Sequence, residues 1–354
     1  MGQEWPGAVV AARKGWPVSV QEQDPSPRGD GGGERPRAVA TSFAAGGLRF
    51  AADRWDPPAG RPRHGLVLLL HGGGQTRHSW RRTGERLAQL GWSAVAVDAR
   101  GHGDTDWDPG QDYSHHAMAD DLGEIVAQLG EPPVLVGASM GGITALLAQA
   151  RTPSLGRALV LVDITPRLEP AGIKHIFEFM TSAPDGFATL EDAADAIAAY
   201  NPNRPKPTNL SGLKKNLRLR DGRWHWHWDP AFMKIRDEAR RELGDEVLPD
   251  ANRPDLFAGA ADMTAQEFAA EAEKTLQTDS LRTAAQAIRV PTLLVRGKQS
   301  DIVSDEGVAE LLELIPHAEY VDVTGAGHMV AGDDNDVFAG RLGDFLTRLP
   351  PVAG

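Results

Sequence analysis

Residues 134–142 read Val-Leu-Val-Gly-Ala-Ser-Met-Gly-Gly and contain the pentapeptide Gly-x-Ser-x-Gly. Apolar residues typical of a buried strand open this stretch, and an apolar helical pattern at residues 143–150 follows it. This order predicts that Ser139 occupies a tight strand-to-helix turn, which lifts its hydroxyl clear of a sheet edge. Gly137 and Gly141 suit such a turn, because a side chain at either position would collide with neighbouring backbone.

Strand and helix patterns alternate on both sides of this stretch, and the runs at 65–70 and 93–97 are apolar throughout, as in strands buried on both faces. Repeated strand–helix units predict an α/β fold with a mostly parallel central sheet flanked by helices. We expect strands at residues 48–55, 65–70, 93–97, 134–136, 158–162, 292–295 and 319–323, and helices at residues 79–90, 119–129, 305–315 and 336–349.

The chain divides into a tail, a core and an insertion. Residues 1–40 are rich in Pro, Gly and charge and predict a flexible tail. Residues 41–164 and 289–354 form the predicted core. Residues 165–288 interrupt the alternation with a polar, helical pattern, including helices at 192–200 and 265–283, and predict a helical cap over the carboxyl ends of the strands.

Composition excludes several classes of function. The 354-residue chain has no cysteine, which removes disulfides, thiol nucleophiles and Cys-based metal sites. Its formal net charge of -12 argues against binding to nucleic acid. Apolar runs are too short to cross a membrane, and the first residues lack the pattern of a secretory signal. We therefore expect a cytoplasmic protein without nucleic-acid or membrane partners. Its oligomeric state stays open, with a homodimer as one option.

A serine hydroxyl needs a base and an orienting acid to act as a nucleophile. His328 is the predicted base, because it lies in a glycine-rich loop just after a strand and before the last helix. Asp301 is the predicted acid, after the strand at 292–295, and the order Ser-Asp-His suits this type of sheet. Asp163 and Asp98 also end strands and are its competitors.

An oxyanion that develops during attack needs two hydrogen-bond donors. The backbone N–H of Met140 is one, because it stands at the positive end of the following helix. The second is expected from the loop at 71–74, His-Gly-Gly-Gly, where Gly73 is the preferred donor and Gly72 or Gly74 the alternative. His71 is expected to brace this loop.

Together these segments resemble those of α/β-hydrolase-fold enzymes over roughly residues 42–350. The matching segments are residues 71–74, 98–106, 137–141, 300–301 and 327–328. The resemblance implies hydrolysis by a Ser-Asp-His triad without a cofactor or metal, and a structural role for the Asp-x-Arg-Gly-x-Gly segment at 98–103.

The resemblance also sorts the reactions of this family. A serine at position 139 disfavours epoxide hydrolases and haloalkane dehalogenases, which carry Asp there. The leading hypothesis is an acyl-enzyme on Ser139 formed from a small carboxylic ester or lactone. The alternatives are a carbon–carbon bond hydrolase of the meta-cleavage type, although Gln75-Thr76 replaces the usual Pro-Gly, and a cofactor-free perhydrolase. A ligand receptor on a retained hydrolase scaffold is a hypothesis from another class.

Substrate specificity is expected to lie in the cap and near the base. The candidate pocket residues are Trp224, Trp228, Phe177 and Met329, with Phe179, Met180 and Phe232 able to serve in the same way. Recognition of a substrate carboxylate by Arg218, Arg220 or Lys214 stays open. His225 and His227 alternate with tryptophans, but no third ligand at a suitable spacing supports a metal site.

Overall fold

The computed structural model describes residues 36–200, 210–233, 278–323 and 336–350. Contacts divide the chain into two units, Met1–Arg35 and Pro36–Gly354, and the described residues all belong to the second. Most of the predicted tail and the predicted base His328 therefore lie outside the described residues.

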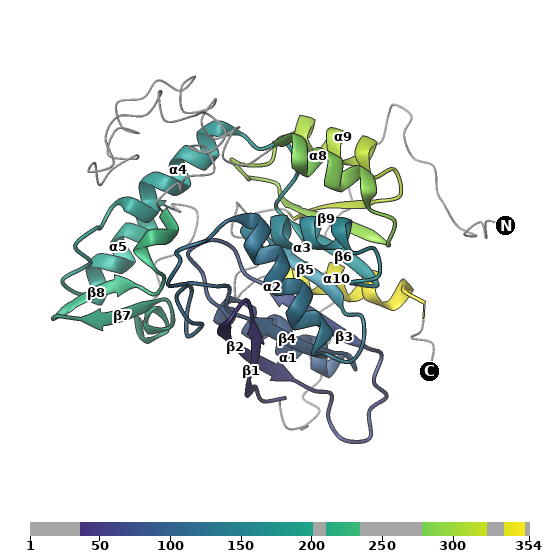
Figure 1. The fold of residues 1–354 in the computed structure, drawn as a ribbon, viewed down its shortest axis with the longest axis horizontal. Helices are drawn as coiled ribbons and strands as arrows, with labels where there is room; N and C mark the ends of the chain where they lie inside the picture. The colour runs from purple at the N-terminus through teal and green to yellow at the C-terminus, as the bar shows by residue number, and fades with distance from the viewer. Residues whose placement is uncertain (1–35, 201–209, 234–277, 324–335, 351–354) are drawn as a thin grey trace. The chain divides into compact units, whose positions relative to one another are not determined.

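The centre of this unit is an eight-stranded sheet with strand order β1-β2-β4-β3-β5-β6-β9-β10 (Figure 1). The strands from β4 to β10 in this order are parallel, whereas β2 pairs antiparallel with both β1 and β4. Their bounds are Val39–Ala45 (β1), Leu48–Trp55 (β2), Leu66–Leu70 (β3), Ser93–Val97 (β4), Val134–Ala138 (β5), Ala158–Val162 (β6), Thr292–Gly297 (β9) and Glu319–Val323 (β10). The predicted mostly parallel sheet is confirmed, and β1 is an additional strand that the sequence analysis did not assign.

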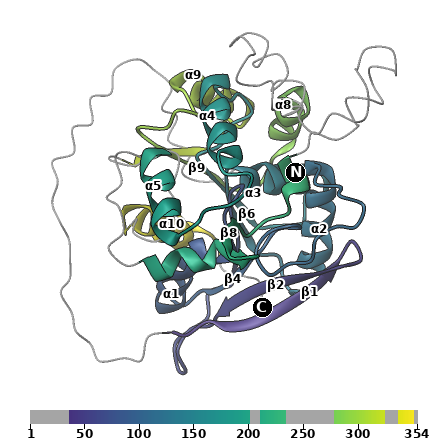
Figure 2. The same ribbon diagram turned by 90° about the vertical axis from the view of Figure 1, so that its left-hand side faces the viewer.

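Helices cover both faces of the sheet, because alternate strand residues point to opposite sides. Leu135 and Leu159 belong to one core cluster, with residues of α2, α3, α8 and α9. Val136 and Val160 belong to the other, with residues of α1 and α10 (Figure 2). The helix bounds are Arg81–Gln89 (α1), His115–Ala127 (α2), Met140–Arg151 (α3), Thr278–Ala287 (α8), Asp305–Leu314 (α9) and Asp336–Arg348 (α10).

The sequence analysis expected a helical insertion, but the described part of the insertion also contains strands. It begins with helices α4 (Pro170–Thr181) and α5 (Leu190–Tyr200) and continues with a two-stranded hairpin, β7 (Leu217–Arg220) and β8 (Arg223–Trp226). The hairpin turns at Asp221-Gly222, where both residues have positive φ, 49° and 78°. Asp-Gly favours this two-residue turn because both residues tolerate left-handed backbone.

The last residues of the predicted cap pack with the core. Helix α8 falls within the predicted cap at 165–288, yet Leu281, Ala284, Ala285 and Ile288 belong to the larger core cluster of the sheet. From here on, "cap" refers to the described residues 165–200 and 210–233. Within the described part of the chain, no helix is long and apolar enough to cross a membrane.

Candidate active site

Ser139 stands between β5 and α3 in a strained backbone conformation, with φ 47° and ψ -116°. Its N–H donates to the carbonyl of Val162 on the neighbouring strand at 3.0 Å. The flanking glycines are required by close packing, since a Cβ at Gly137 would lie 2.3 Å from the carbonyl oxygen of Gly141, and one at Gly141 would lie 2.5 Å from that of Leu70. The predicted strand-to-helix turn is therefore present, and positive φ in a non-glycine residue is typical of functional sites.

The glycine loop, residues 71–74, lies beside this turn. A Cβ at Gly72 would be 3.5 Å from the Cβ of Ser139. The Gly72 N–H donates to Gln75 Oε1 at 3.1 Å, and the Gly74 N–H donates to His102 Nε2 at 3.3 Å. The Gly73 N–H has no acceptor among the described residues. Of the three glycines, Gly73 is thus the one whose N–H remains available to a ligand next to Ser139.

Two buried histidines hold the loop from behind. His71 Nε2 accepts from the N–H of Ala99 at 2.9 Å, so its Nδ1 carries the proton and donates to the Gly72 carbonyl at 2.8 Å. Burial lowers the pKa of His71 to about 4 and that of His102 to about 3. Both imidazoles are neutral at pH 7, which agrees with the predicted bracing role of His71.

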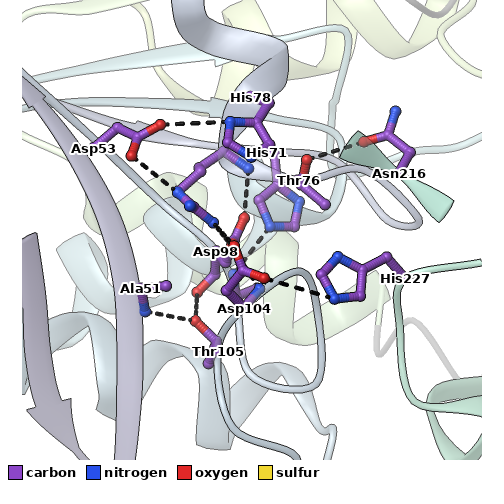
Figure 3. A network of polar contacts seen from close by, with 12 residues as sticks. Ala51, Asp53, His71, Thr76, His78, Asp98, Asp104, Thr105, Asn216 and His227 are labelled. Carbon is purple, nitrogen blue, oxygen red and sulfur yellow. Dashed lines mark hydrogen bonds and ion pairs between the residues drawn. The ribbon is translucent and has the colours of Figure 1, made fainter. Parts of the chain in front are cut away.

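Asp98 organises the loop that ends β4 and is not available as a catalytic acid. Its fully buried carboxylate accepts from the N–H of Arg77 at 2.6 Å and from the N–H of Asp104 at 2.9 Å, and it pairs with the Arg77 guanidinium (Figure 3). A Cβ at Gly103 would lie 2.2 Å from Asp98 Oδ2, so only glycine fits there. The predicted structural role of this segment matches these contacts.

Arg77 joins three carboxylates, Asp53 from β2 and Asp98 and Asp104 from the loop after β4. Its guanidinium lies 3.2 Å from Asp53 Oδ1 and 2.9 Å from Asp104 Oδ2, besides its contact with Asp98. Burial disfavours its charge, but the nearby carboxylates of Asp98 and Asp53 outweigh burial and raise the pKa of Arg77. Asp104 also reaches the cap, where Arg218 Nη2 lies 2.9 Å from its Oδ1.

The two remaining candidate acids lie at neighbouring strand ends. Asp163 follows β6 with φ 51° and is 1 % exposed; it accepts from the N–H of Gly297 at 3.0 Å and from Ser300 Oγ at 2.7 Å. It therefore supports the acid loop, residues 297–303, that carries Asp301. The Asp301 side chain is 43 % exposed and lies 3.1 Å from Nδ1 of His175 on α4.

The cap contacts the acid loop closely. A Cβ at Gly172 would lie 2.2 Å from the carbonyl oxygen of Asp301, and the N–H of Glu169 donates to the carbonyl of Ile302 at 2.8 Å. Helix α4 is thus joined to the acid loop by backbone packing as well as by His175. The sequence offered no signal for the His175 contact, because it depends on how the cap lies over the core.

Aromatic rings form a continuous row through the cap. The ring centroids of Trp228 and Trp226 are 5.0 Å apart, those of Trp226 and Phe179 are 5.5 Å apart, and those of Phe179 and Tyr200 are 4.3 Å apart. Tyr200 then contacts His175, with 4.7 Å between the centroids. The row connects the glycine loop at one end with the acid loop at the other.

Apolar side chains cover the glycine loop directly. A Cβ at Gly74 would lie 3.1 Å from Trp228 Cζ3 and 3.2 Å from Met180 Cε, and one at Gly73 would lie 3.8 Å from Phe232 Cζ. Trp228 was among the predicted pocket residues, and Met180 and Phe232 were named beside it. The wall of the site next to Gly73 and Gly74 is therefore apolar.

The other predicted pocket residues are placed differently. Trp224 packs in the cap's own cluster, with Phe187 and Leu217. Phe177 is half-buried on α4, and Met329, like His328, lies outside the described residues. The structure thus brings Trp228 to the glycine loop but gives Trp224 a place inside the cap.

The basic residues that the sequence analysis left open each have a partner. Arg218 pairs with Asp104. Arg220 lies over the ring of Trp107, 4.9 Å from its centroid, and Lys214 lies 5.7 Å from the centroid of Trp224. The described residues include no cluster of three or more His, Cys, Asp or Glu suited to a metal ion.

The fold and the strained serine turn identify the class of protein. Residues 65–334 match the model of the α/β hydrolase fold family, and the chain belongs to that family. Esterase Rv0045c of Mycobacterium tuberculosis is 29% identical over 292 residues, which cover 80% of this chain and 82% of that protein. Its solved structure superposes with a TM-score of 0.62 at 26% identity, covering 89% of this chain and 93% of that one.

A second relative has a different printed activity. The 2-(acetamidomethylene)succinate hydrolase of Mesorhizobium japonicum is 27% identical over 282 residues, which cover 79% of this chain and 87% of that protein. A crystal structure of E-2-(acetamidomethylene)succinate hydrolase has a TM-score of 0.67 at 22% identity, with 88% of this chain and 100% of that chain covered. This likeness shows the shared fold.

Proposed function

We propose that the protein hydrolyses a small carboxylic ester or lactone through an acyl-enzyme on Ser139. His328 takes the proton from Ser139 Oγ as that oxygen attacks the carbonyl carbon. The alcohol leaves with a proton returned by His328, and a water molecule, activated by the same imidazole, releases the acid. Asp301 orients His328 and stabilises its positive charge.

The observation that carries this proposal is the glycine loop beside the strained serine turn, where a Cβ at Gly72 would lie 3.5 Å from the Cβ of Ser139. In this loop the N–H groups of Gly72 and Gly74 already have acceptors, and that of Gly73 has none among the described residues. Met140 begins α3, so its N–H lacks an intrahelical partner. Gly73 and Met140 together supply the two donors that a tetrahedral oxyanion needs.

The side chains over the site support an apolar substrate. Trp228, Met180 and Phe232 cover the glycine loop, and they offer dispersion contacts but no charge. Arg218 joins the cap to the loop after β4 through its ion pair with Asp104. We infer that the group next to the scissile carbonyl is apolar or aromatic. An uncharged ester suits such a wall better than the charged, substituted succinate named for the Mesorhizobium relative.

The test is a substrate panel with wild type and Ser139→Ala. The panel contains p-nitrophenyl esters from acetate to octanoate, phenyl esters, a lactone, an aromatic diacid monoester, a ring-fission dienoate and a peracid assay. The proposal expects ester turnover in the wild type and a loss of roughly 10⁴-fold or more in the variant. Cleavage of the dienoate without ester turnover would replace it with carbon–carbon bond hydrolysis.

A further inference from the structure

His102 occupies the space behind the glycine loop and contacts two peptide groups. Its side chain is fully buried, its Nδ1 donates to the carbonyl of Arg100 at 3.0 Å, and its Nε2 accepts the N–H of Gly74 at 3.3 Å. These contacts require a neutral ring with the proton on Nδ1, because an imidazolium has no acceptor for Gly74. The ring therefore restrains the orientation of the peptide that joins Gly73 to Gly74.

The glycine loop needs such a restraint. Three consecutive glycines lose more conformational entropy on ordering than any other sequence, and Gly74 adopts φ 72°. Gln75 fixes the first peptide of the loop through its contact with Gly72. His71 Nδ1 and the Gln75 N–H hold the Gly72 carbonyl, which belongs to the peptide that carries the Gly73 N–H, and His102 fixes the next and last peptide.

The cap in turn holds His102. The N–H of Gly103 donates to the carbonyl of His227 at 2.8 Å, the N–H of Asp229 donates to the carbonyl of Gly101 at 2.8 Å, and His102 forms a β-bridge with Trp228. The imidazole also meets the ring of Phe232 edge-on, with 4.7 Å between the centroids. Residues 227–229 of the cap and the glycine loop are thus linked through His102.

We propose that His102 is a positioning residue, which orients the Gly73 N–H toward the oxyanion by accepting the Gly74 N–H. Because His102 also contacts cap residues 227–229, a shift of these residues would change the position of that donor. The inference rests on the proposed acyl transfer at Ser139. It assigns His102 no proton transfer and no direct contact with the substrate.

Two isosteric substitutions separate this role from a purely structural one. In His102→Gln, Oε1 stands where Nε2 was and can still accept from Gly74. In His102→Asn, Nδ2 stands where Nδ1 was and can still donate to the carbonyl of Arg100, but Gly74 loses its acceptor. Positioning of the oxyanion donor predicts that the Gln variant is the more active; a role confined to the loop at 98–106 predicts the reverse order.

The kinetic experiment measures kcat, KM and inhibition by a trifluoromethyl ketone for wild type, both variants and the control His78→Gln. His78 is a suitable control because its Nδ1 lies 3.4 Å from Asp53 Oδ2 on β2. We expect His102→Asn to lose roughly 10- to 100-fold in kcat with little change in KM. Its affinity for the ketone, whose tetrahedral adduct carries an oxyanion, should fall in parallel. His102→Gln should recover most of both, and His78→Gln should resemble wild type. An Asn variant as active as the Gln variant overturns the inference.

A second readout does not depend on activity. Hydrogen exchange of the Gly74 amide, followed by NMR, should be slow in wild type and His102→Gln and faster by at least roughly 10-fold in His102→Asn. Equal exchange in all three proteins overturns the inference even if no ester is turned over. Slow exchange in a wild type that hydrolyses no ester would overturn the proposed function and leave the hydrogen bond itself established.

Discussion

The imidazole rings of His71 and His102, from the segments that follow β3 and β4, lie 5.3 Å apart, and each accepts a backbone N–H with one nitrogen. Neither ring can be protonated without losing that acceptor. Two neutral histidines therefore form a rigid support beneath the glycine loop, and their neutrality has a consequence for stability.

The free energy of unfolding should begin to decrease as the pH is lowered below about 6.5, which is well above the pH at which carboxylates titrate. The pKa values of His71 and His102 are lowered to about 4 and about 3, mainly by burial, from an ordinary 6.5. The unfolded chain binds protons near pH 6.5 and the folded chain does not, so stability is complete above pH 6.5 and is lost as pH falls toward 4. Each histidine should contribute a slope of about 1.4 kcal/mol per pH unit in that window.

Urea unfolding of wild type and His102→Gln at pH 7, 6 and 5 measures this slope. The variant should depend less steeply on pH, by about 1.4 kcal/mol per pH unit between pH 6 and 5. Parallel curves for the two proteins would mean that His102 is protonated in the folded state, against its contacts.

Substitution of Asp301 should mainly lower activity, whereas substitution of Asp163 should mainly lower stability. Asp301→Asn should lower kcat by roughly 10³- to 10⁴-fold, because in the proposed mechanism its charge orients His328. The melting temperature should change little, because the Asp301 side chain is 43 % exposed. Asp163→Asn should mainly reduce stability, by about 1–3 kcal/mol, because its buried oxygens hold Gly297 and Ser300. Kinetics and thermal melts of both variants check this. The opposite pattern would make Asp163 the triad acid.

Removing Arg77 should destabilise the core strongly. Arg77→Met leaves Asp98 buried without its countercharge, and the expected loss is about 3–5 kcal/mol in the free energy of unfolding. The double variant Arg77→Met with Asp98→Asn should recover part of this loss. Arg81→Met is the matched control, because its 3.7 Å pair with Glu85 is on the surface and worth less than about 1 kcal/mol. Equal losses at Arg77 and Arg81 would contradict the account.

Substrate preference should respond to the residues that cover the glycine loop. Met180→Ala or Trp228→Ala should increase the ratio of kcat/KM for octanoate over acetate esters, by roughly 10-fold, because each opens space beside Gly74. Trp224→Ala is the control, since Trp224 packs within the cap cluster. An unchanged ratio in the first two variants would show that the acyl chain lies elsewhere.

Local patterns predicted the core well. The strands at 93–97 and 158–162 are continuous apolar runs, and their bounds agree with β4 and β6. The turn at Ser139 was predictable because glycine, serine and flanking periodicity all lie within one short stretch. The hairpin β7–β8 was missed although Asp221-Gly222 indicated it, because polar and aromatic residues hid its alternation.

Contacts between distant segments were less accessible to sequence reasoning. His102 and His175 look like ordinary loop and helix residues, and their partners Gly74 and Asp301 are defined only by how the cap and loops pack. The same holds for α8, which reads as part of the insertion but packs in the core.

The most direct measurement is covalent labelling of the nucleophile. Wild type treated with a fluorophosphonate, and separately quenched during turnover of a p-nitrophenyl ester, is digested and its peptides are weighed by mass spectrometry. The account predicts an adduct on the peptide that contains Ser139, and no adduct in Ser139→Ala that retains the wild-type melting temperature. Labelling at another residue, or turnover that persists in Ser139→Ala, would contradict it.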